Sequence, residues 1–255
     1  VYKIQLYAGT AFSEIATEYD ATKREQLLEE VVVTAHHLKV EKDKSGINTT
    51  SFSLPPRFDN VPIDLSEKLK GYPGLSINRT GQPGALTQTR IRGAEANHTL
   101  VLIDGIEVND PATGNEYNFA NSTHLAVKSV EVVRGPMTSR YGSEAVGGLV
   151  AIETLNPAAQ DDRATVYAAT GSQNQREIAL CAGLASTAKV KAGLTVSASE
   201  SDGYNVSNFG SEKDGSDQAN LIGHLDIEVS ESMSLGLVVL ANQTNTMGDL
   251  SLIHI

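Results

Sequence analysis

Apolar and polar residues alternate with a period of two along several long segments beyond Asp162. From Val190 to Ser199 every second residue is apolar or small, and the pattern returns from Leu221 to Ser230. Because successive side chains of a strand point to opposite faces, this alternation predicts strands with one apolar and one polar face. We expect five strands, at about 163–170, 175–184, 188–199, 218–230 and 233–243.

The lengths of the connections narrow the choice of architecture. The connections after the second and fourth strands are tight, whereas the one after the third, Glu200 to Asp217, is long and acidic. Short turns on one side and long loops on the other are typical of an up-and-down barrel in an outer membrane. A soluble β-sandwich also fits this pattern. A closed antiparallel barrel needs about 8 strands or more, so a barrel in this sequence would be incomplete.

Residues 60–157 have the pattern of a compact domain that mixes helix and strand. Asp64 with Glu67 predicts a capping box that opens a short helix before Gly71. Buried strands are expected at 100–103, 130–133 and 149–152. The loops 78–88 and 109–118 are rich in Gly, Asn and Pro, and such loops on a rigid sheet often carry binding residues.

The remaining segments show no pattern of a packed domain. Residues 1–29 are interpreted as a lead-in or the remnant of a signal sequence, because small residues follow a short apolar stretch. Residues 30–59 are polar around the apolar run Val31–Val33 and predict an extended linker. Residues 158–249 hold the five strands. Residues 250–255 break the alternation, and we interpret them as a non-native tail.

Composition and charge exclude several classes of function. Lys and Arg number 20 against 31 Asp and Glu, and the net charge of −11 disfavours binding to nucleic acid. The single cysteine, Cys181, forms neither an internal disulfide nor a thiolate metal site. No apolar run reaches the roughly 18 residues of a membrane-spanning helix. Phosphate-loop, paired-histidine zinc and nucleophile-elbow motifs are absent, so we expect no enzyme.

Four ordered blocks resemble the plug domain of TonB-dependent outer-membrane receptors. They are Arg90–Gly93, Asn97–Pro111, Val130–Pro136 and Arg140–Thr154. The resemblance covers about 30–157 and is greatest to cobalamin receptors, followed by catecholate-siderophore receptors. It implies an α+β plug domain followed by the first antiparallel strands of a transmembrane β-barrel. Since the family barrel has 22 strands, about 17 would lie outside this sequence.

The resemblance also assigns roles to particular residues. Glu30, Val31, Val32, Val33, Thr34 and Ala35 resemble the TonB box, and a β-branched run in a polar linker suits pairing with the exposed sheet edge of TonB. Arg92 and Arg134 match the two plug arginines that, in the family, pair with carboxylates of the barrel and lock the plug in place. Substrate contacts are expected from residues of the two loops, namely Arg79, Gln82, Asn109, Asp110, Asn115 and Tyr117.

No cofactor is implied except calcium, which comparable acidic loops bind in cobalamin receptors. The candidate ligands are Asp202, Asp214 and Asp217. The sequence departs from the family pattern at Gly203–Asn205, where an Asp would be expected, and no EF-hand spacing is present.

The family implies uptake of cobalamin or a ferric siderophore, with TonB and outer-membrane lipid as further partners, in the outer membrane of a Gram-negative bacterium. The alternative is a non-transporting periplasmic binding module, a plug-like domain fused to a soluble β-sandwich. The scarcity of aromatic residues favours this alternative, since Tyr167 is the only aromatic residue in the five predicted strands.

Overall fold

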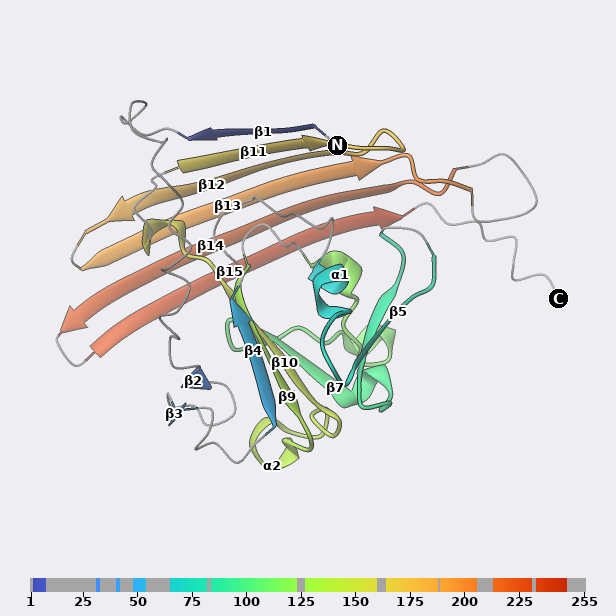
Figure 1. The fold of residues 1–255 in the computed structure, drawn as a ribbon. Helices are drawn as coiled ribbons and strands as arrows, with labels where there is room; N and C mark the ends of the chain where they lie inside the picture. Colours follow the sequence, from blue (N-terminus) through green and yellow to red (C-terminus); the bar gives the residue numbers. More distant parts are fainter. Residues whose placement is uncertain are drawn as a thin grey trace, which may run out of the picture.

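The computed structural model contains a curved antiparallel sheet with a smaller mixed domain packed against one of its faces (Figure 1). We call the sheet the wall and the smaller domain the plug. The structure describes residues 2–7, 31–32, 40–41, 48–53, 65–81, 84–122, 127–159, 164–187, 189–205, 213–230 and 233–246. Among these residues, no helix is long and apolar enough to cross a membrane.

The wall has six strands in the order β1-β11-β12-β13-β14-β15, all antiparallel. Their bounds are Tyr2–Tyr7 for β1, Ala164–Thr170 for β11, Arg176–Ser186 for β12, Val190–Ser201 for β13, Ser216–Ser230 for β14 and Met233–Thr246 for β15. The five predicted strands are confirmed to within a few residues. The sixth, β1, lies in the segment that was interpreted as a lead-in, and that interpretation is wrong for Tyr2–Tyr7.

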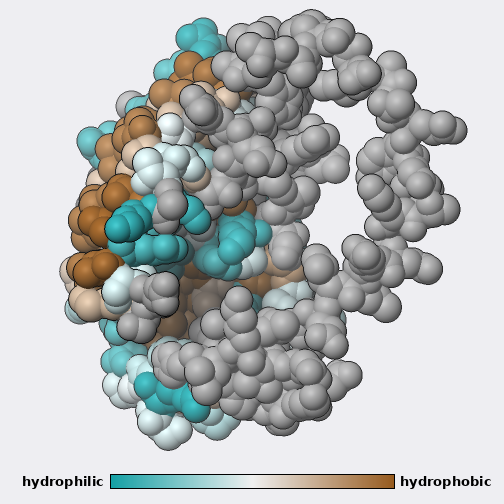
Figure 2. Space-filling view, turned by 90° about the vertical axis from the view of Figure 1, so that its left-hand side faces the viewer, coloured by the Kyte–Doolittle hydropathy of each residue, from teal (hydrophilic) through white to brown (hydrophobic). Residues whose placement is uncertain are grey.

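The two faces of the wall differ as the alternation predicted. One row across the sheet joins Val166, Leu180, Val196 and Leu221, and all four side chains are exposed. The adjacent row contains Cys181, Thr195 and Ile222, which are buried on the plug side. Figure 2 shows apolar residues gathered along one flank of the molecule. The apolar face of the wall therefore points away from the plug.

The plug contains a five-stranded sheet in the order β4-β9-β10-β7-β8. Its strands are β4 (Thr49–Ser53), β7 (Thr99–Ile103), β8 (Ile106–Glu107), β9 (Val127–Arg134) and β10 (Gly148–Thr154). β10 runs parallel to β7, and the other neighbours are antiparallel. β7, β9 and β10 fall at the three predicted buried runs.

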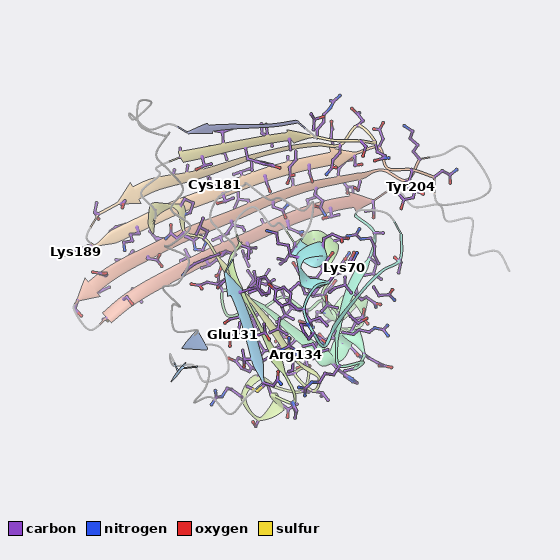
Figure 3. All side chains as sticks on the ribbon, in the orientation of Figure 1. Lys70, Glu131, Arg134, Cys181, Lys189 and Tyr204 are labelled. Atoms are coloured by element: carbon purple, nitrogen blue, oxygen red, sulfur yellow. The ribbon has the colours of Figure 1, made fainter. Side chains whose placement is uncertain are left out.

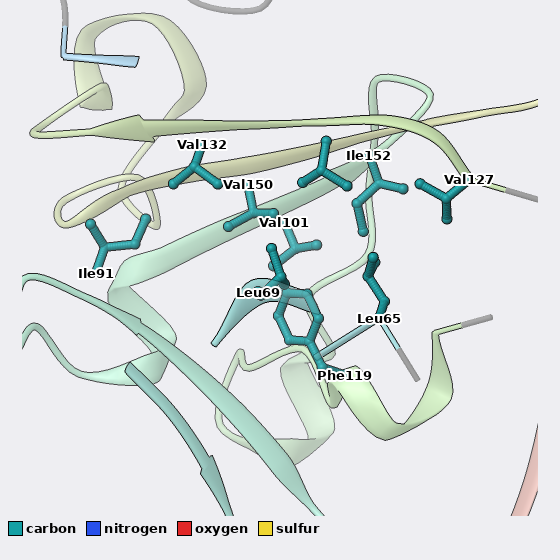
Figure 4. Packing of buried hydrophobic residues seen from close by; sticks show 10 residues of the cluster. Leu65, Leu69, Ile91, Val101, Phe119, Val127, Val132, Val150 and Ile152 are labelled. Carbon is teal, nitrogen blue, oxygen red and sulfur yellow. The ribbon is translucent and has the colours of Figure 1, made fainter. Parts of the chain in front are cut away.

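A short helix and a hairpin cover one face of the plug sheet. The helix is α1 (Leu65–Leu69), and the hairpin pairs β5 (Leu75–Arg79) with β6 (Thr87–Ile91). Leu65, Leu69 and Phe119 are fully buried beneath Val101 and other apolar residues of the sheet (Figure 4). The short helix was predicted, although Asp64, its predicted cap, lies outside the described residues.

Short helices connect these elements. The 3₁₀ turns are η4 (Ala96–His98), η5 (Pro111–Thr113), η6 (Phe119–Asn121) and η7 (Pro157–Ala159), and α2 is Thr138–Tyr141. η7 joins the plug to the wall.

Two predictions about the plug are wrong in detail. The expected linker 30–59 contains β4, and Phe52 on this strand stacks on Tyr72 with ring centroids 4.2 Å apart. The expected loop 78–88 is shorter, because its two ends belong to β5 and β6. Both segments are edge strands or hairpins with one polar face, so their polar composition resembled that of loops.

Candidate functional site

The boundary between plug and wall is the candidate functional site, because side chains of β14 and β15 bind the plug backbone there. The amide of Gln218 on β14 donates a hydrogen bond to the carbonyl of Ala120. Asn242 Nδ2 on β15 donates to the carbonyl oxygen of Asn121 at 3.0 Å. Both acceptors lie on η6. Polar side chains of the wall therefore hold η6 in place through hydrogen bonds to the backbone carbonyl groups of η6.

A second contact joins the end of β10 to β14. The Asp104 carboxylate accepts hydrogen bonds from both the backbone N–H of Thr154, at 2.8 Å, and the Thr154 hydroxyl. The same hydroxyl oxygen lies 2.9 Å from His224 Nε2. Since the hydroxyl gives its only proton to Asp104, we assign the proton of this third contact to His224 Nε2. His224 and Thr154 are both buried, so this chain of hydrogen bonds is shielded from water.

Replacing Thr154 with valine is expected to weaken this contact by about 2 kcal/mol, because Asp104 and His224 would each lose a buried partner. We expect faster hydrogen–deuterium exchange in peptides of β10 from a full-length receptor that contains this chain. Thr89→Val is the matched control, since the Thr89 hydroxyl is buried without a hydrogen-bond partner in the described structure. Equal exchange in both variants would contradict a role for the Thr154 hydroxyl.

Several residues predicted to bind substrate make contacts within the plug, and their contacts with a substrate stay a prediction. The side chain of Asn109 is buried and makes three hydrogen bonds, to Val101 N at 2.8 Å, Thr99 O at 3.1 Å and Asn115 O at 3.0 Å. The Arg79 guanidinium lies 3.2 Å from the Glu67 carboxylate and so ties β5 to α1. Both amide N–H groups of Asn109 are therefore used within the plug.

Among the other predicted loop residues, Tyr117 packs within the plug and Asp110 is exposed. Tyr117 packs edge-on against Phe119, with ring centroids 5.0 Å apart, and burial raises the pKa of its phenol. Asp110 is exposed and caps η5 by accepting from Ala112 N at 2.9 Å. Asn115 takes a left-handed conformation, with φ of 63°, in the same turn. Gln82 lies outside the described residues.

The predicted locking arginines lie next to each other in the plug. Arg134 lies within the plug (Figure 3) and is buried. It donates from Nε to the carbonyl of Pro73 at 2.8 Å and from Nη1 to Thr50 Oγ1 at 2.7 Å. Burial, followed by the positive charge of Arg92, lowers the pKa of Arg134. Neither arginine forms an ion pair with an acidic residue in the described structure. Their pairing with barrel carboxylates stays a prediction.

The TonB-box and calcium predictions are only partly covered by the structure. Val31–Val32 forms β2, which pairs with β3 (Val40–Glu41), and the rest of the predicted box lies outside the described residues. Asp202 pairs with Lys213 at 3.4 Å. No group of three or more metal-ligating side chains occurs within the described ranges, so Asp202, Asp214 and Asp217 are not gathered there as calcium ligands.

A cavity of about 680 Å³ lies between the plug and the wall. Its lining includes Leu86 of the plug, most residues of the segment 107–118, Thr154, and residues near the middle of β14 and β15. The sequence did not single out Thr154, Asp104 or His224. Asp104 could have been found from the tight turn that it begins after a buried strand, and His224 from its place on the polar face of a predicted strand.

Comparison with known proteins relates this fold to a class of receptors. Residues 59–149 match the model of the TonB-dependent Receptor Plug Domain. This part of the chain is similar to the plug domain of the TonB-dependent receptors, and the wall strands β11 to β15 follow it along the chain. The resemblance found in the sequence and the predicted fold class are confirmed.

The matched relatives are receptors and transporters. The chain is 28% identical over 208 residues to the vitamin B12 transporter BtuB of Vibrio vulnificus, covering 80% of this chain and 33% of that protein. It is 31% identical over 214 residues to the BtuB of Vibrio cholerae, covering 81% and 34%. The crystal structure of the siderophore receptor PirA from Acinetobacter baumannii has a similar fold, with a TM-score of 0.59, 20% identity, and coverage of 81% and 33%. The chain thus spans about a third of the length of each relative.

Proposed function

We propose that the chain is part of an outer-membrane receptor that takes up a large, scarce ligand, such as cobalamin or a ferric siderophore, with energy from TonB. The observation that carries this proposal is the plug domain packed on the polar face of a sheet whose opposite face is apolar. The vitamin B12 and siderophore receptors among the relatives support it.

The apolar face of the wall suits contact with lipid. Exposed apolar side chains recur on every wall strand from β11 to β15, and they are Val166, Ile178, Leu180, Leu184, Val196, Leu221, Val229, Met233, Leu235, Leu237 and Val239. In a transmembrane barrel these residues face the hydrocarbon, while the alternate residues face inward. A soluble β-sandwich would cover this face with a second sheet. The comparisons do not favour that alternative.

The energy for uptake is proposed to enter through residues 30–35. A β-branched run that precedes the plug is suited to pairing with TonB as an added strand. Force on this segment reaches the plug at β4, which is the first strand of the plug sheet along the chain.

Deleting residues 30–35 from the full-length receptor is expected to abolish uptake and to leave ligand binding largely intact. The reason is that β2, the described part of this segment, belongs neither to the five-stranded sheet of the plug nor to the wall. Uptake of radiolabelled ligand and equilibrium binding to cells measure the two effects separately.

The substitution Val32→Pro tests the pairing itself, because proline removes a backbone donor that strand addition needs. Val40→Pro places the same change on β3, outside the predicted box, and serves as the control. Normal uptake by both the deletion and Val32→Pro would contradict this mechanism.

A further inference from the structure

The segment 154–158, at the end of the plug, runs across the wall strands on their plug side, and we call it the strap. At its start, the Thr154 hydroxyl lies 2.9 Å from His224 Nε2 on β14. Two residues later, Asn156 Nδ2 donates a hydrogen bond to Asp226 Oδ2, also on β14, at 2.7 Å. The strap then passes over β13 and β12. It therefore contacts three neighbouring strands of the wall before the chain enters β11.

Two glycines side by side on the wall form the surface on which the strap lies. Gly183 of β12 and Gly193 of β13 are Cα partners, and Gly193 is also the partner of His224 on β14. The contact of His224 with Thr154 shows that this row faces the plug. The row has no side chain on β12 or β13, so it forms a channel that runs across the strands.

The strap fits closely into this channel. A Cβ atom added at Gly193 would lie 2.5 Å from Asn156 Oδ1 and 2.6 Å from Pro157 Cδ. One added at Gly183 would lie 3.2 Å from Ala158 Cα. Pro157 and Ala158 are buried there. No side chain fits at Gly193 without moving the strap, and one at Gly183 would press on its backbone.

Asn156 fixes the position of the strap along the channel. Its amide nitrogen donates to the Asp226 carboxylate, and its amide oxygen accepts from Ala158 N at 3.0 Å. The side chain thus connects β14 to the start of η7. A hydrogen bond to an ionised carboxylate is stronger than one between neutral groups. The strap is therefore held both by close packing and by a charge-assisted hydrogen bond.

We propose that Asn156, Gly183 and Gly193 are positioning residues that hold the strap on the wall throughout transport. The pull from residues 30–35 then opens the plug from β4 and leaves η7 in place. This inference rests on the proposed function and adds which end of the plug stays fixed. If the strap came off the wall, residues 155–163 would supply about 30 Å of free chain. The pull would then displace the whole plug before it strained β4.

A cross-link between the strap and the wall tests whether this contact persists during transport. Asn156→Cys with Asp226→Cys places two thiols where side-chain atoms are 2.7 Å apart, so a short bis-methanethiosulfonate reagent can join them. The full-length receptor also carries Cys181→Ala, which removes the only cysteine of this sequence. We expect this cross-link to permit TonB-dependent uptake. Uptake is measured with radiolabelled cyanocobalamin and, separately, with radiolabelled ferric enterobactin.

The matched cross-link joins the wall to the plug at η6. Asn242 Nδ2 lies 3.0 Å from Asn121 O, and both residues line the larger cavity. We expect the cross-linked Asn121→Cys, Asn242→Cys receptor to take up neither probe until a reductant is added, because a large ligand passes only where the plug leaves the wall. Uptake that is blocked by the strap cross-link, or unaffected by either cross-link, would overturn the inference. Absence of TonB-dependent uptake of both probes by the parental receptor would overturn the proposed function itself.

The hydrogen bond of Asn156 can be removed and then restored. In Asn156→Asp two carboxylates face each other, so we expect uptake to fall about tenfold while binding of the probe changes less than about twofold. Adding Asp226→Asn supplies a donor from the other side of the contact and is expected to recover uptake. Asp226→Asn alone is the control, because Asn156 can still donate to the remaining oxygen. Failure of the double variant to recover uptake would overturn the role assigned to Asn156.

The substitution Gly193→Ala tests the channel itself. Because its methyl group would overlap Asn156 and Pro157, we expect peptides of the strap to exchange hydrogen for deuterium about tenfold faster in the full-length receptor. Gly236→Ala is the matched control. Gly236 is the Cα partner of Asp226 on the same face of the wall, and an added Cβ atom there would lie 3.5 Å from Asp226 Oδ1, an ordinary contact distance. Equal exchange in the two variants would overturn the role of the channel.

Discussion

Replacing Gly148 with alanine is expected to disrupt the central sheet of the plug, with a loss of about 3 kcal/mol or more. Gly148 begins β10 with φ of 142°, a conformation that residues with a side chain rarely adopt. A Cβ atom there would lie 2.2 Å from the carbonyl oxygen of Val133 and 3.0 Å from Ile91 Cδ1. Because the carbonyl belongs to the backbone of β9, the clash is relieved only by moving one strand from the other.

Hydrogen–deuterium exchange of the full-length receptor measures this effect. Peptides of β9 and β10 in Gly148→Ala are expected to exchange about a hundredfold faster than in the parent protein. Gly105→Ala is the matched control, since Gly105 also has a positive φ, of 82°, but no atom within 4 Å of the added Cβ. It is expected to cost only about 1 kcal/mol. Similar exchange in the two variants would show that backbone conformation, and not the clash, sets the cost.

The wall could be predicted from the sequence because each of its strands repeats one simple pattern. The side chains in the row that joins Leu180, Val196 and Leu221 are apolar on each of these strands. The alternation within one strand can therefore be recognised without knowing which strand lies next to it. β1 shows the same alternation in Tyr2, Ile4 and Leu6, but the segment is only six residues long and precedes a polar stretch. Its partner β11 follows more than 150 residues later, and the sequence contains no sign of that pairing.

β4 was missed for a different reason. It is an edge strand made mostly of Thr and Ser, and its position depends on the side chain of Arg134 and on the stacking of Phe52 with Tyr72. These partners are distant in sequence. Local composition therefore indicated a linker where tertiary contacts form a strand.

The site was less predictable than the fold, because residue type does not reveal which partner a polar group has. Asn109 and Asn118 lie in the same Asn-rich segment. Both line the cavity, but Asn109 makes three hydrogen bonds to the plug backbone, through its amide oxygen and nitrogen, whereas Asn118 accepts a hydrogen bond from Thr87 N at 2.9 Å. Likewise, the sequence of β14 does not indicate that His224, among the polar residues of this strand, contacts Thr154.

Replacing Arg134 with alanine is expected to release β4 from the plug sheet at a cost of about 3 kcal/mol. The Arg134 guanidinium joins three segments, since it donates to Pro73 O, to Thr50 Oγ1 and, at 3.2 Å, to Asn48 Oδ1. Without it, buried acceptors lose charge-assisted hydrogen bonds, and β4 is held mainly by its backbone pairing with β9. Exchange of the β4 amides is expected to accelerate about a hundredfold, and that of β10 to change much less.

Two further variants separate the hydrogen bonds of Arg134 from its charge. Arg134→Lys keeps the positive charge but lacks the planar fork, so we expect it to recover less than half of the lost protection. Arg92→Asn removes the neighbouring charge and retains a residue that tolerates the φ of 51° at this position, so the protection of β4 is expected to persist. Because β4 is the first strand of the plug sheet that a pull from residues 30–35 would reach, release of β4 in Arg134→Ala should also change uptake more than ligand binding. Parental exchange of β4 in Arg134→Ala would show that the backbone pairing alone holds this strand.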